Sequence, residues 1–278
     1  MQIHPTIAGL RAALKSARPA QRIALVPTMG NLHDGHIALM TEARRHAAIV
    51  VGTIFVNRLQ FRPGEDFEKY PRTFEADCAR LAAAGVDHLF APDEAEMYPQ
   101  PQGYHVEPPA EQTGILEGAV RPGHFRGVAT VVMKLFQIAQ PDVALFGKKD
   151  FQQLMVIRNM VRDLNLPIEI IGGETIRAED GLALSSRNGY LDATQRAEAP
   201  QLFKTLTKVV AELHRGNRDF PALERLAEDE LKSRGWLPDY VAVREKIGLQ
   251  SPAAHDSELI VLGAARLGST RLIDNLEV

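Results

Sequence analysis

The feature that most constrains the fold of this chain is a regular alternation of short apolar runs with longer helical patterns. The apolar runs cover Ile23–Val26, Ala48–Val56, His88–Ala91 and Val143–Phe146. Runs of this length and β-branched content are typical of strands buried on both faces of a parallel sheet. Between them, apolar residues recur at helical spacing in Ile37–His46, Thr73–Ala84, Val128–Gln140 and Phe151–Leu164. This order predicts an α/β fold with a Rossmann-like, doubly wound parallel sheet.

The alternation ends close to Gly181, and a different pattern follows. The C-terminal part contains two charged helical segments and three strand-like runs, at Thr194–His214, Phe220–Arg234, Tyr240–Arg244, Leu259–Leu267 and Arg271–Ile273. We therefore predict two domains. The first is a Rossmann-like ligand-binding domain at 1–177, and the second is a smaller α+β lid domain at 178–278.

Composition excludes several classes of protein. The 278 residues carry 32 Lys and Arg against 35 Asp and Glu, a net charge of −3, which argues against a generally basic nucleic-acid binder. One cysteine, Cys78, cannot form an intrachain disulfide. No apolar run reaches the ~18 residues of a membrane span, and the first residues lack the pattern of a signal peptide. We expect a cytoplasmic protein without a nucleic-acid or membrane partner.

The most informative segment is Pro27–His36, PTMGNLHDGH, which follows an apolar strand and precedes an amphipathic helix. In a doubly wound sheet such a loop lies at the carboxyl end of a strand, where ligands bind. His33 and His36 are three residues apart, so both lie on one face of the first helical turn. The helix N-terminus favours an anion there, and two imidazoles can donate to phosphate oxygens. The alternative, a surface loop with two solvent-exposed histidines, fits this strand–turn–helix context less well.

Amide side chains follow the next strand. The segment Phe55–Phe61, FVNRLQF, contains Asn57 and Gln60, whose amides can both donate to and accept from a hydroxy-acid. The alternative is a polar loop capped by an asparagine.

A third strand-to-helix junction is Phe146–Gln153, FGKKDFQQ. Gly147 permits close approach of a ligand to the backbone. Lys149 can place a positive charge on phosphates, and Asp150 is positioned to cap the following helix. Gln153, one turn further on, points to the same edge of the sheet.

Two further strings carry polar groups. Asp180–Asn188, DGLALSSRN, contains two hydroxyls and a guanidinium, at Ser185, Ser186 and Arg187, which together can bind a polyphosphate. The alternative is an ordinary polar linker. Arg121–Gly127, RPGHFRG, is either an exposed basic loop or part of a site.

These segments resemble one protein family. The HxxH segment is similar to the HIGH signature of the nucleotidylyltransferase superfamily, which includes class I aminoacyl-tRNA synthetases. The strings PTMGNLHDGH, FVN..QF, YPRT, RPGHFRG, GKKDFQQ and RLIDN resemble those of its pantothenate synthetase (pantoate–β-alanine ligase) branch. They occur in the family's order and span nearly the whole chain.

The resemblance implies an ATP-dependent condensation of pantoate with β-alanine to pantothenate, through a pantoyl adenylate, with release of AMP and pyrophosphate. It implies catalytic roles for His33, His36, Lys149 and Arg187, with His36 acting as phosphate ligand or proton donor. It implies that Asn57, Gln60 and Gln153 bind pantoate. The residues it implies for ATP are Met29, Gly30, Asn31, Leu32, His33, Asp34, Gly35, His36, Gly147, Lys148, Lys149, Asp150, Ile176, Leu184, Ser185, Ser186 and Arg187.

The resemblance also implies Mg²⁺ on the phosphates, with few protein ligands, and a homodimer. Asp77 is the one carboxylate we consider as a magnesium ligand. The sequence departs from the family strings at Arg58, where proline is usual, and at Lys148, where glutamate is usual.

Two other functions remain open from the sequence. One is a different HxGH nucleotidylyltransferase, which need not contain the FVN..QF and GKKDFQQ strings. The other is a non-enzymatic nucleotide-sensing module, which would have lost the acid-binding glutamines Gln60 and Gln153. A Walker loop, a GxGxxG fingerprint, an HExxH motif and a GxSxG elbow are absent from the sequence.

Overall fold

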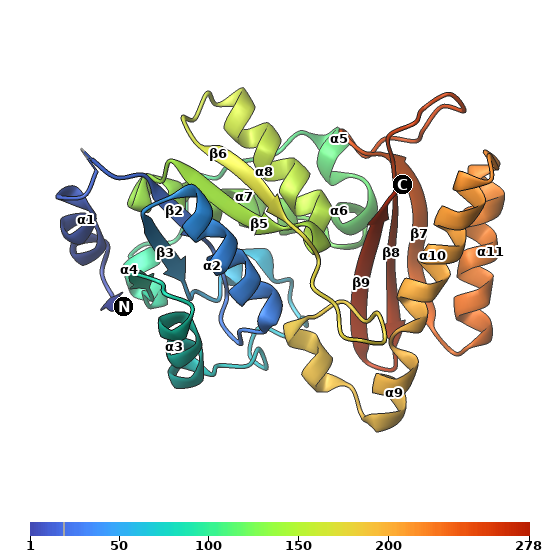
Figure 1. The fold of residues 1–278 in the computed structure, drawn as a ribbon, viewed down its shortest axis with the longest axis horizontal. Coiled ribbons are helices and arrows are strands. Elements are labelled where there is room, and N and C mark those ends of the chain that lie inside the picture. The colour runs from blue at the N-terminus through green and yellow to red at the C-terminus, as the bar shows by residue number, and fades with distance from the viewer. Residues whose placement is uncertain (19) are drawn as a thin grey trace.

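The computed structural model describes residues 1–18 and 20–278, and in this part of the chain two sheets stand side by side (Figure 1). The larger sheet has six strands in the order β1-β4-β3-β2-β5-β6, and every neighbouring pair is parallel. Its strands are β1 (Gln2–His4), β2 (Ile23–Val26), β3 (Ile49–Thr53), β4 (His88–Phe90), β5 (Val143–Gly147) and β6 (Glu169–Gly173). The predicted α/β fold with a parallel doubly wound sheet is confirmed.

The strand order places a crevice at the carboxyl end of β2. The chain continues from β2 to β3 on one side, whereas β5 pairs with β2 on the other, so that Leu25 lies between Val51 and Ala144. Such a point, where the strand order reverses, is where open α/β sheets bind their ligands.

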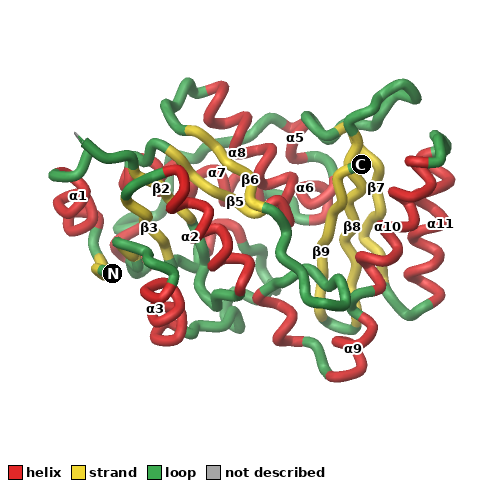
Figure 2. Tube along the Cα trace, viewed as in Figure 1, coloured by secondary structure: helices red, strands yellow, loops and turns green. Residues whose placement is uncertain are grey.

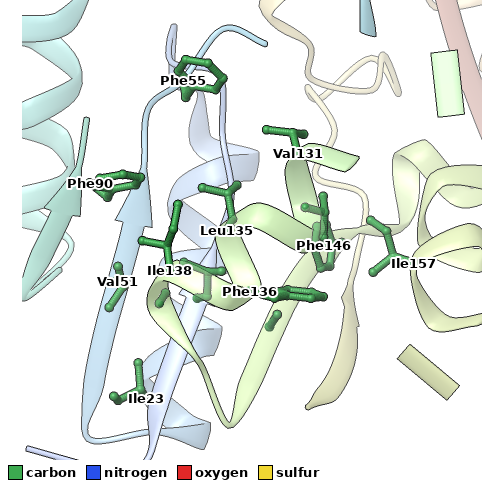
Figure 3. Close-up of a cluster of buried hydrophobic side chains, with 14 of the residues drawn as sticks. Ile23, Val51, Phe55, Phe90, Val131, Leu135, Phe136, Ile138, Phe146 and Ile157 are labelled. Atoms are coloured by element: carbon green, nitrogen blue, oxygen red, sulfur yellow. The ribbon is translucent and has the colours of Figure 1, made fainter. Parts of the chain in front are cut away.

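Helices cover both faces of this sheet, and the strands alternate between them. Ile23 and Leu25 of β2 pack into a cluster with α1 (Ile7–Lys15), α7 (His124–Ala139) and α8 (Phe151–Asp163) (Figure 3). Their neighbours Ala24 and Val26 pack into a second cluster with α2 (Asp34–His46) and α3 (Phe74–Ala83). The sheet is therefore buried on both sides, as the continuous apolar runs predicted.

The C-terminal part forms a three-stranded antiparallel sheet beside the first (Figure 2). Its strands are β7 (Leu237–Glu245), β8 (Leu259–Leu267) and β9 (Thr270–Glu277), and α10 (Gln201–His214) and α11 (Phe220–Ser233) pack on one face. The predicted single helix over Thr194–His214 is wrong, because the chain forms α9 (Ala193–Glu198) and then α10. Pro200 separates them, since its nitrogen carries no hydrogen and its ring clashes with the carbonyl one turn earlier.

An apolar cluster and a two-bond ion pair join the two parts. Phe125 and Phe151 of the first part pack with Ile260 of β8. Arg271 of β9 holds Glu117 through two bonds of 2.6 and 2.7 Å. The division at 177/178 remains a prediction; β6 ends four residues before it, at Gly173.

The sequence did not predict the shorter elements of the fold. Besides β1, α1 and β6, these are α4 (Glu94–Met97), α5 (Ala110–Thr113), α6 (Leu116–Val120) and the 3₁₀ turns η1 (Arg58–Gln60), η2 (Lys148–Asp150) and η3 (Ser186–Tyr190). No helix in the described ranges is both long enough and apolar enough to cross a membrane.

Candidate active site at the carboxyl edge of the sheet

Two adjoining cavities lie at the carboxyl edge of the large sheet. The smaller has a volume of about 230 Å³ and the larger about 580 Å³. The smaller cavity brings together most of the predicted site residues: Met29, His33, Gly35, His36, Asn57, Gln60, Gly147, Lys149, Asp150, Gln153, Ile176, Leu184, Ser185, Ser186 and Arg187. Lys149, Gln153, Ser185 and Arg187 also line the larger cavity, so they stand where the two meet.

His33 and His36 form a reciprocal cap at the start of α2. The ring Nδ1 of His33 accepts the N–H of Gly35 at 3.2 Å, and the Nδ1 of His36 accepts the N–H of His33 at 3.2 Å. Burial and then the charge of Lys149 lower the pKa of His33 to about 4. Burial and then His33 lower the pKa of His36 to about 3. Both rings are therefore neutral at pH 7 and carry their proton on Nε2, which is free to donate to a ligand.

Asp77 of α3 fixes the loop that carries these histidines. Its buried carboxylate accepts the N–H groups of Asn31 and Leu32, each at 2.8 Å, and the hydroxyl of Thr73 at 3.1 Å. The loop needs this anchor because Gly30 and Asn31 adopt left-handed φ values of 83° and 50°. Asp77 therefore positions the loop, and its assignment as a magnesium ligand stays a prediction.

Gln60 reaches into the smaller cavity from η1, and Asn57 holds it there. The Asn57 amide donates to the Gln60 side-chain oxygen at 3.2 Å and to the Gly127 carbonyl at 3.2 Å, and it accepts the Tyr98 hydroxyl at 2.7 Å. Gly127 lets α7 approach closely, because a Cβ there would lie 2.2 Å from the Leu59 carbonyl. Asn57 lines the cavity and its amide holds the Gln60 side chain in place, while its predicted contact with pantoate stays a prediction.

The backbone of Gln60 is fixed by a buried histidine. His124 Nε2 faces the Arg121 guanidinium at 3.1 Å, and because arginine can only donate, this nitrogen accepts. The proton therefore lies on Nδ1, which donates to the Gln60 carbonyl at 2.9 Å. Burial and then the Arg121 charge lower the pKa of His124 to about 4, which keeps the ring neutral.

The side chains of the neighbouring residues Lys149 and Lys148 lie in different environments. Lys149 lines both cavities. The Lys148 ammonium lies 2.5 Å from Glu174 and 3.4 Å from Glu277, and this lysine is not part of either lining. Asn275 of β9 donates to the carbonyls of both lysines at 2.9 Å, so the C-terminal sheet holds this turn in place.

The strip Ser185–Arg187 reaches the site from the C-terminal part. Ser186 donates its hydroxyl to the Asn31 carbonyl at 3.0 Å, and the Asn31 amide donates back to the Ser186 carbonyl at 3.2 Å. The Arg187 guanidinium forms a two-bond ion pair with Asp66, at 3.0 and 3.1 Å. The predicted meeting of this strip with the paired histidines and Lys149 is thus present in one cleft.

Comparison with known proteins assigns the chain to a family. A sequence profile described as "Pantoate-beta-alanine ligase" matches residues 2–277. The chain belongs to the pantoate–β-alanine ligase family. It is 58% identical to the pantothenate synthetase of Chromobacterium violaceum, covering 100% of this chain and 99% of the relative. It is 55% identical to that of Thiobacillus denitrificans, covering 100% and 97%.

Solved structures of pantoate–β-alanine ligases have the same fold. The crystal structure of pantothenate synthetase from Thermus thermophilus superposes with a TM-score of 0.94 at 46% identity, over 100% of this chain and 99% of that one. The ligase from Francisella tularensis, described as complexed with Beta-gamma ATP and β-alanine, has a TM-score of 0.85 at 34% identity, over 100% and 97%.

The structure also accommodates the two departures from the pantoate–β-alanine ligase strings. Arg58 turns outward, where it pairs with Glu94 at 3.1 Å and lies over the Phe67 ring at 4.0 Å. Lys148 pairs with Glu174 and Glu277 as described, so its added charge is neutralised.

Five of the residues that the resemblance implied for ATP line neither cavity in the part of the chain that the structure describes. These are Gly30, Asn31, Leu32, Asp34 and Lys148. Gly30, Asn31 and Leu32 shape the histidine loop through the contacts with Asp77. Asp34 pairs with Arg80 outside the cavities. Arg126 of the RPGHFRG string pairs with Glu107 at 3.2 Å and is also outside the linings.

Several parts of the site carried no signal in the sequence. Val128, Val131 and Leu135 of α7 form an apolar wall of the smaller cavity, and their helical spacing had indicated only a core helix. Glu65 and Asp66 lie in a loop for which no strand or helix pattern gave a signal. Their partners are arginines more than fifty residues away in the sequence, which only the fold brings near.

Proposed function

We propose that this protein condenses pantoate with β-alanine at the expense of ATP, through an enzyme-bound pantoyl adenylate. The observation that carries the proposal is the convergence of neutral histidines, Lys149 and the Ser185–Arg187 strip on a cavity that also contains two glutamine amides, Gln60 and Gln153. Membership of the family, and the ATP and β-alanine named for the Francisella tularensis relative, support it.

Pantoate binds in the smaller cavity in this proposal. The side chains of Gln60 and Gln153 both reach it. The Gln60 amide already accepts from Asn57 and donates one N–H to the Met29 sulfur at 3.2 Å, so one N–H and one oxygen lone pair remain for a hydroxyl or carboxylate. The apolar wall contributed by α7, with Val131 and Leu135, suits the methyl groups of a branched hydroxy-acid.

ATP binds across the edge of the sheet in this proposal. His33 and His36 donate from Nε2, Lys149 supplies a point charge, and Ser185 and Arg187 add donors from the other side. Ile176 and Leu184 line the same cavity and provide apolar surface for the adenine. Preorganised donors of this kind stabilise the charge that develops on phosphate oxygens in the transition state.

The chemistry follows from this arrangement. The pantoate carboxylate oxygen attacks the α-phosphorus, the bond to the bridging oxygen of pyrophosphate breaks, and pantoyl adenylate forms. The amine of β-alanine then attacks the acyl carbon, AMP leaves with the electron pair, and the amine loses a proton. His36 is a phosphate donor in this scheme, because in the ligand-free site its pKa of about 3 leaves the ring neutral and its Nδ1 accepts from His33, so that the proton lies on Nε2.

Magnesium would arrive with the nucleotide. The described residues contain no group of three His, Cys, Asp or Glu that could hold a metal ion by themselves. This fits Mg²⁺, which keeps its waters and binds through one or two carboxylates together with substrate phosphates. Asp150 lines both cavities and makes no hydrogen bond that caps α8, so it is the carboxylate we assign to such an ion. The ion would neutralise phosphate charge.

We propose that the protein is a cytoplasmic homodimer, and that 178–278 acts as a lid domain over the site. Sedimentation at several protein concentrations tests the dimer.

The proposed reaction is tested by product analysis. The protein is incubated with ATP, Mg²⁺ and pantoate, with and without β-alanine, and the products are identified by mass. Pyrophosphate and pantoyl adenylate are expected without β-alanine, and AMP and pantothenate with it. Formation of ADP and phosphate in place of AMP and pyrophosphate would refute the adenylate route.

A further inference from the structure

Two adjacent carboxylates, Glu65 and Asp66, each hold a different arginine at the junction of the two cavities. Both lie in the loop between η1 and α3, and both line the larger cavity. Glu65 binds Arg121 through bonds of 3.1 and 2.7 Å, and Asp66 binds Arg187 through bonds of 3.0 and 3.1 Å. Each is thus a bidentate pair, the arrangement that fixes a guanidinium most strictly.

Asp66 determines how Arg187 is presented. The carboxylate takes the Nε and Nη2 positions of the guanidinium, so the outer Nη1 group has no protein partner among the residues that the structure describes. Arg187 lines both cavities, next to Ser185 and Lys149. Burial acts to raise the pKa of Asp66, but the bond and charge of Arg187 outweigh it and lower the pKa, so the carboxylate stays ionised.

Glu65 acts on a different set of groups. It takes the Nε and Nη2 positions of Arg121, whose Nη1 faces His124 Nε2 at 3.1 Å. His124 in turn donates to the Gln60 carbonyl at 2.9 Å. A chain of four groups therefore runs from Glu65 to the backbone of Gln60, the side chain of which is proposed to bind pantoate.

We propose that Glu65 and Asp66 are positioning residues for different substrates: Asp66 orients Arg187 toward the ATP phosphates, and Glu65 fixes Gln60 for pantoate through Arg121 and His124. The inference rests on the proposed function, and it assigns to two neighbours on one loop two separable effects on the reaction. A loop that these pairs merely anchored would affect both substrates alike.

The test uses the isosteric variants Glu65→Gln and Asp66→Asn in the full chain, with Glu169→Gln as matched control. Glu169 forms a pair of 3.0 Å with Arg22, but both side chains are about half exposed, at 55% and 52%, and lie outside both cavity linings. The KM for ATP, the KM for pantoate and kcat are measured from pantothenate formation. Wild-type protein that forms no pantothenate would refute the proposed function, not this inference.

A split between the two KM values is expected. D66N should raise the KM for ATP about tenfold and the KM for pantoate less than about twofold, since one of two charge-assisted bonds on Arg187 is lost. E65Q should show the reverse, and E169Q should resemble wild type. Equal increases of both KM values in both variants would overturn the proposal. So would a lower KM for ATP in D66N, which would mean that Asp66 competes with phosphate.

A second variant covers loss of folding. If D66N does not fold, Asp66→Glu is measured in the same way, because it keeps the charge but displaces the carboxylate by one methylene. An unchanged KM for ATP in D66E, at a melting temperature equal to that of wild type, would likewise overturn the role of Asp66.

Discussion

Replacing Asp77 by asparagine tests whether this carboxylate supports the histidine loop. The wild-type oxygens accept the N–H groups of Asn31 and Leu32 at 2.8 Å each, and the hydroxyl of Thr73 at 3.1 Å. In D77N one oxygen becomes an NH₂ group, so a backbone N–H then faces a donor in a buried place. One charge-assisted bond is lost and one donor is unsatisfied. Together these changes lower the free energy of unfolding by about 3 kcal/mol.

That free energy can be measured by unfolding. For a sheet domain of this size, 3 kcal/mol corresponds to a fall in the melting temperature of about 6–12 °C. The KM values for ATP and pantoate should both rise, because the loop from Met29 to His36 contributes to a cavity shared by both substrates. Melting is followed by calorimetry and by circular dichroism, on the variant and on wild type.

The outcome separates two roles of Asp77. A positioning role lowers stability in the absence of any metal or nucleotide. A magnesium ligand would instead leave the melting temperature unchanged and raise the concentration of Mg²⁺ needed for half-maximal activity. A melting temperature within about 1 °C of wild type would refute the reasoning from the contacts of Asp77.

Three other perturbations are predicted. His36→Ala and Lys149→Ala should each slow pyrophosphate release about 10²–10³-fold, as for loss of an oxyanion donor; equal turnover would contradict their placement. Gln60→Ala should raise the KM for pantoate more than that for ATP, and an unchanged KM for pantoate would refute its assignment. The pKa values of about 4, 3 and 4 for His33, His36 and His124 lie below those of unfolded histidines, near 6.5. The unfolded chain therefore binds more protons as the pH falls from about 6.5 toward 4, and these residues lower stability progressively over that window. For His124 this is tested by urea unfolding of His124→Gln. If the urea midpoint of the variant depended on pH as strongly as that of wild type, His124 would not contribute to the loss of stability at low pH.

Most of the sheet could be predicted because its strands are buried on both faces. Ile23–Val26 and Val143–Phe146 are continuous apolar runs, and the structure confirms β2 and β5 there. The edge strands were not predicted, because no residue of Gln2–His4 or Glu169–Gly173 is fully buried and both carry polar residues or glycine. A strand can be predicted from a sequence mainly because its burial requires a run of apolar residues, and less because of intrinsic strand propensity.

The site could be predicted as a set of motifs but not as a set of contacts. His33, Gln60 and Lys149 each follow a strand, and all three line the smaller cavity. The engagement of Asn57 and Asp77 by protein groups was not visible, because their partners come from α7 and from the β2–α2 loop. A polar side chain at a sheet edge either meets the ligand or supports the neighbour that does, and only the fold distinguishes these cases.

Asn275 has a mechanical consequence for the two halves of the molecule. Its amide bonds to the carbonyls of Lys148 and Lys149 connect β9 directly to the turn that presents Lys149. A movement of β9 away from the large sheet would either break both bonds or move Lys149 with it. If the C-terminal part moves as the proposed lid with these bonds intact, the turn that presents Lys149 to the cavities moves with it.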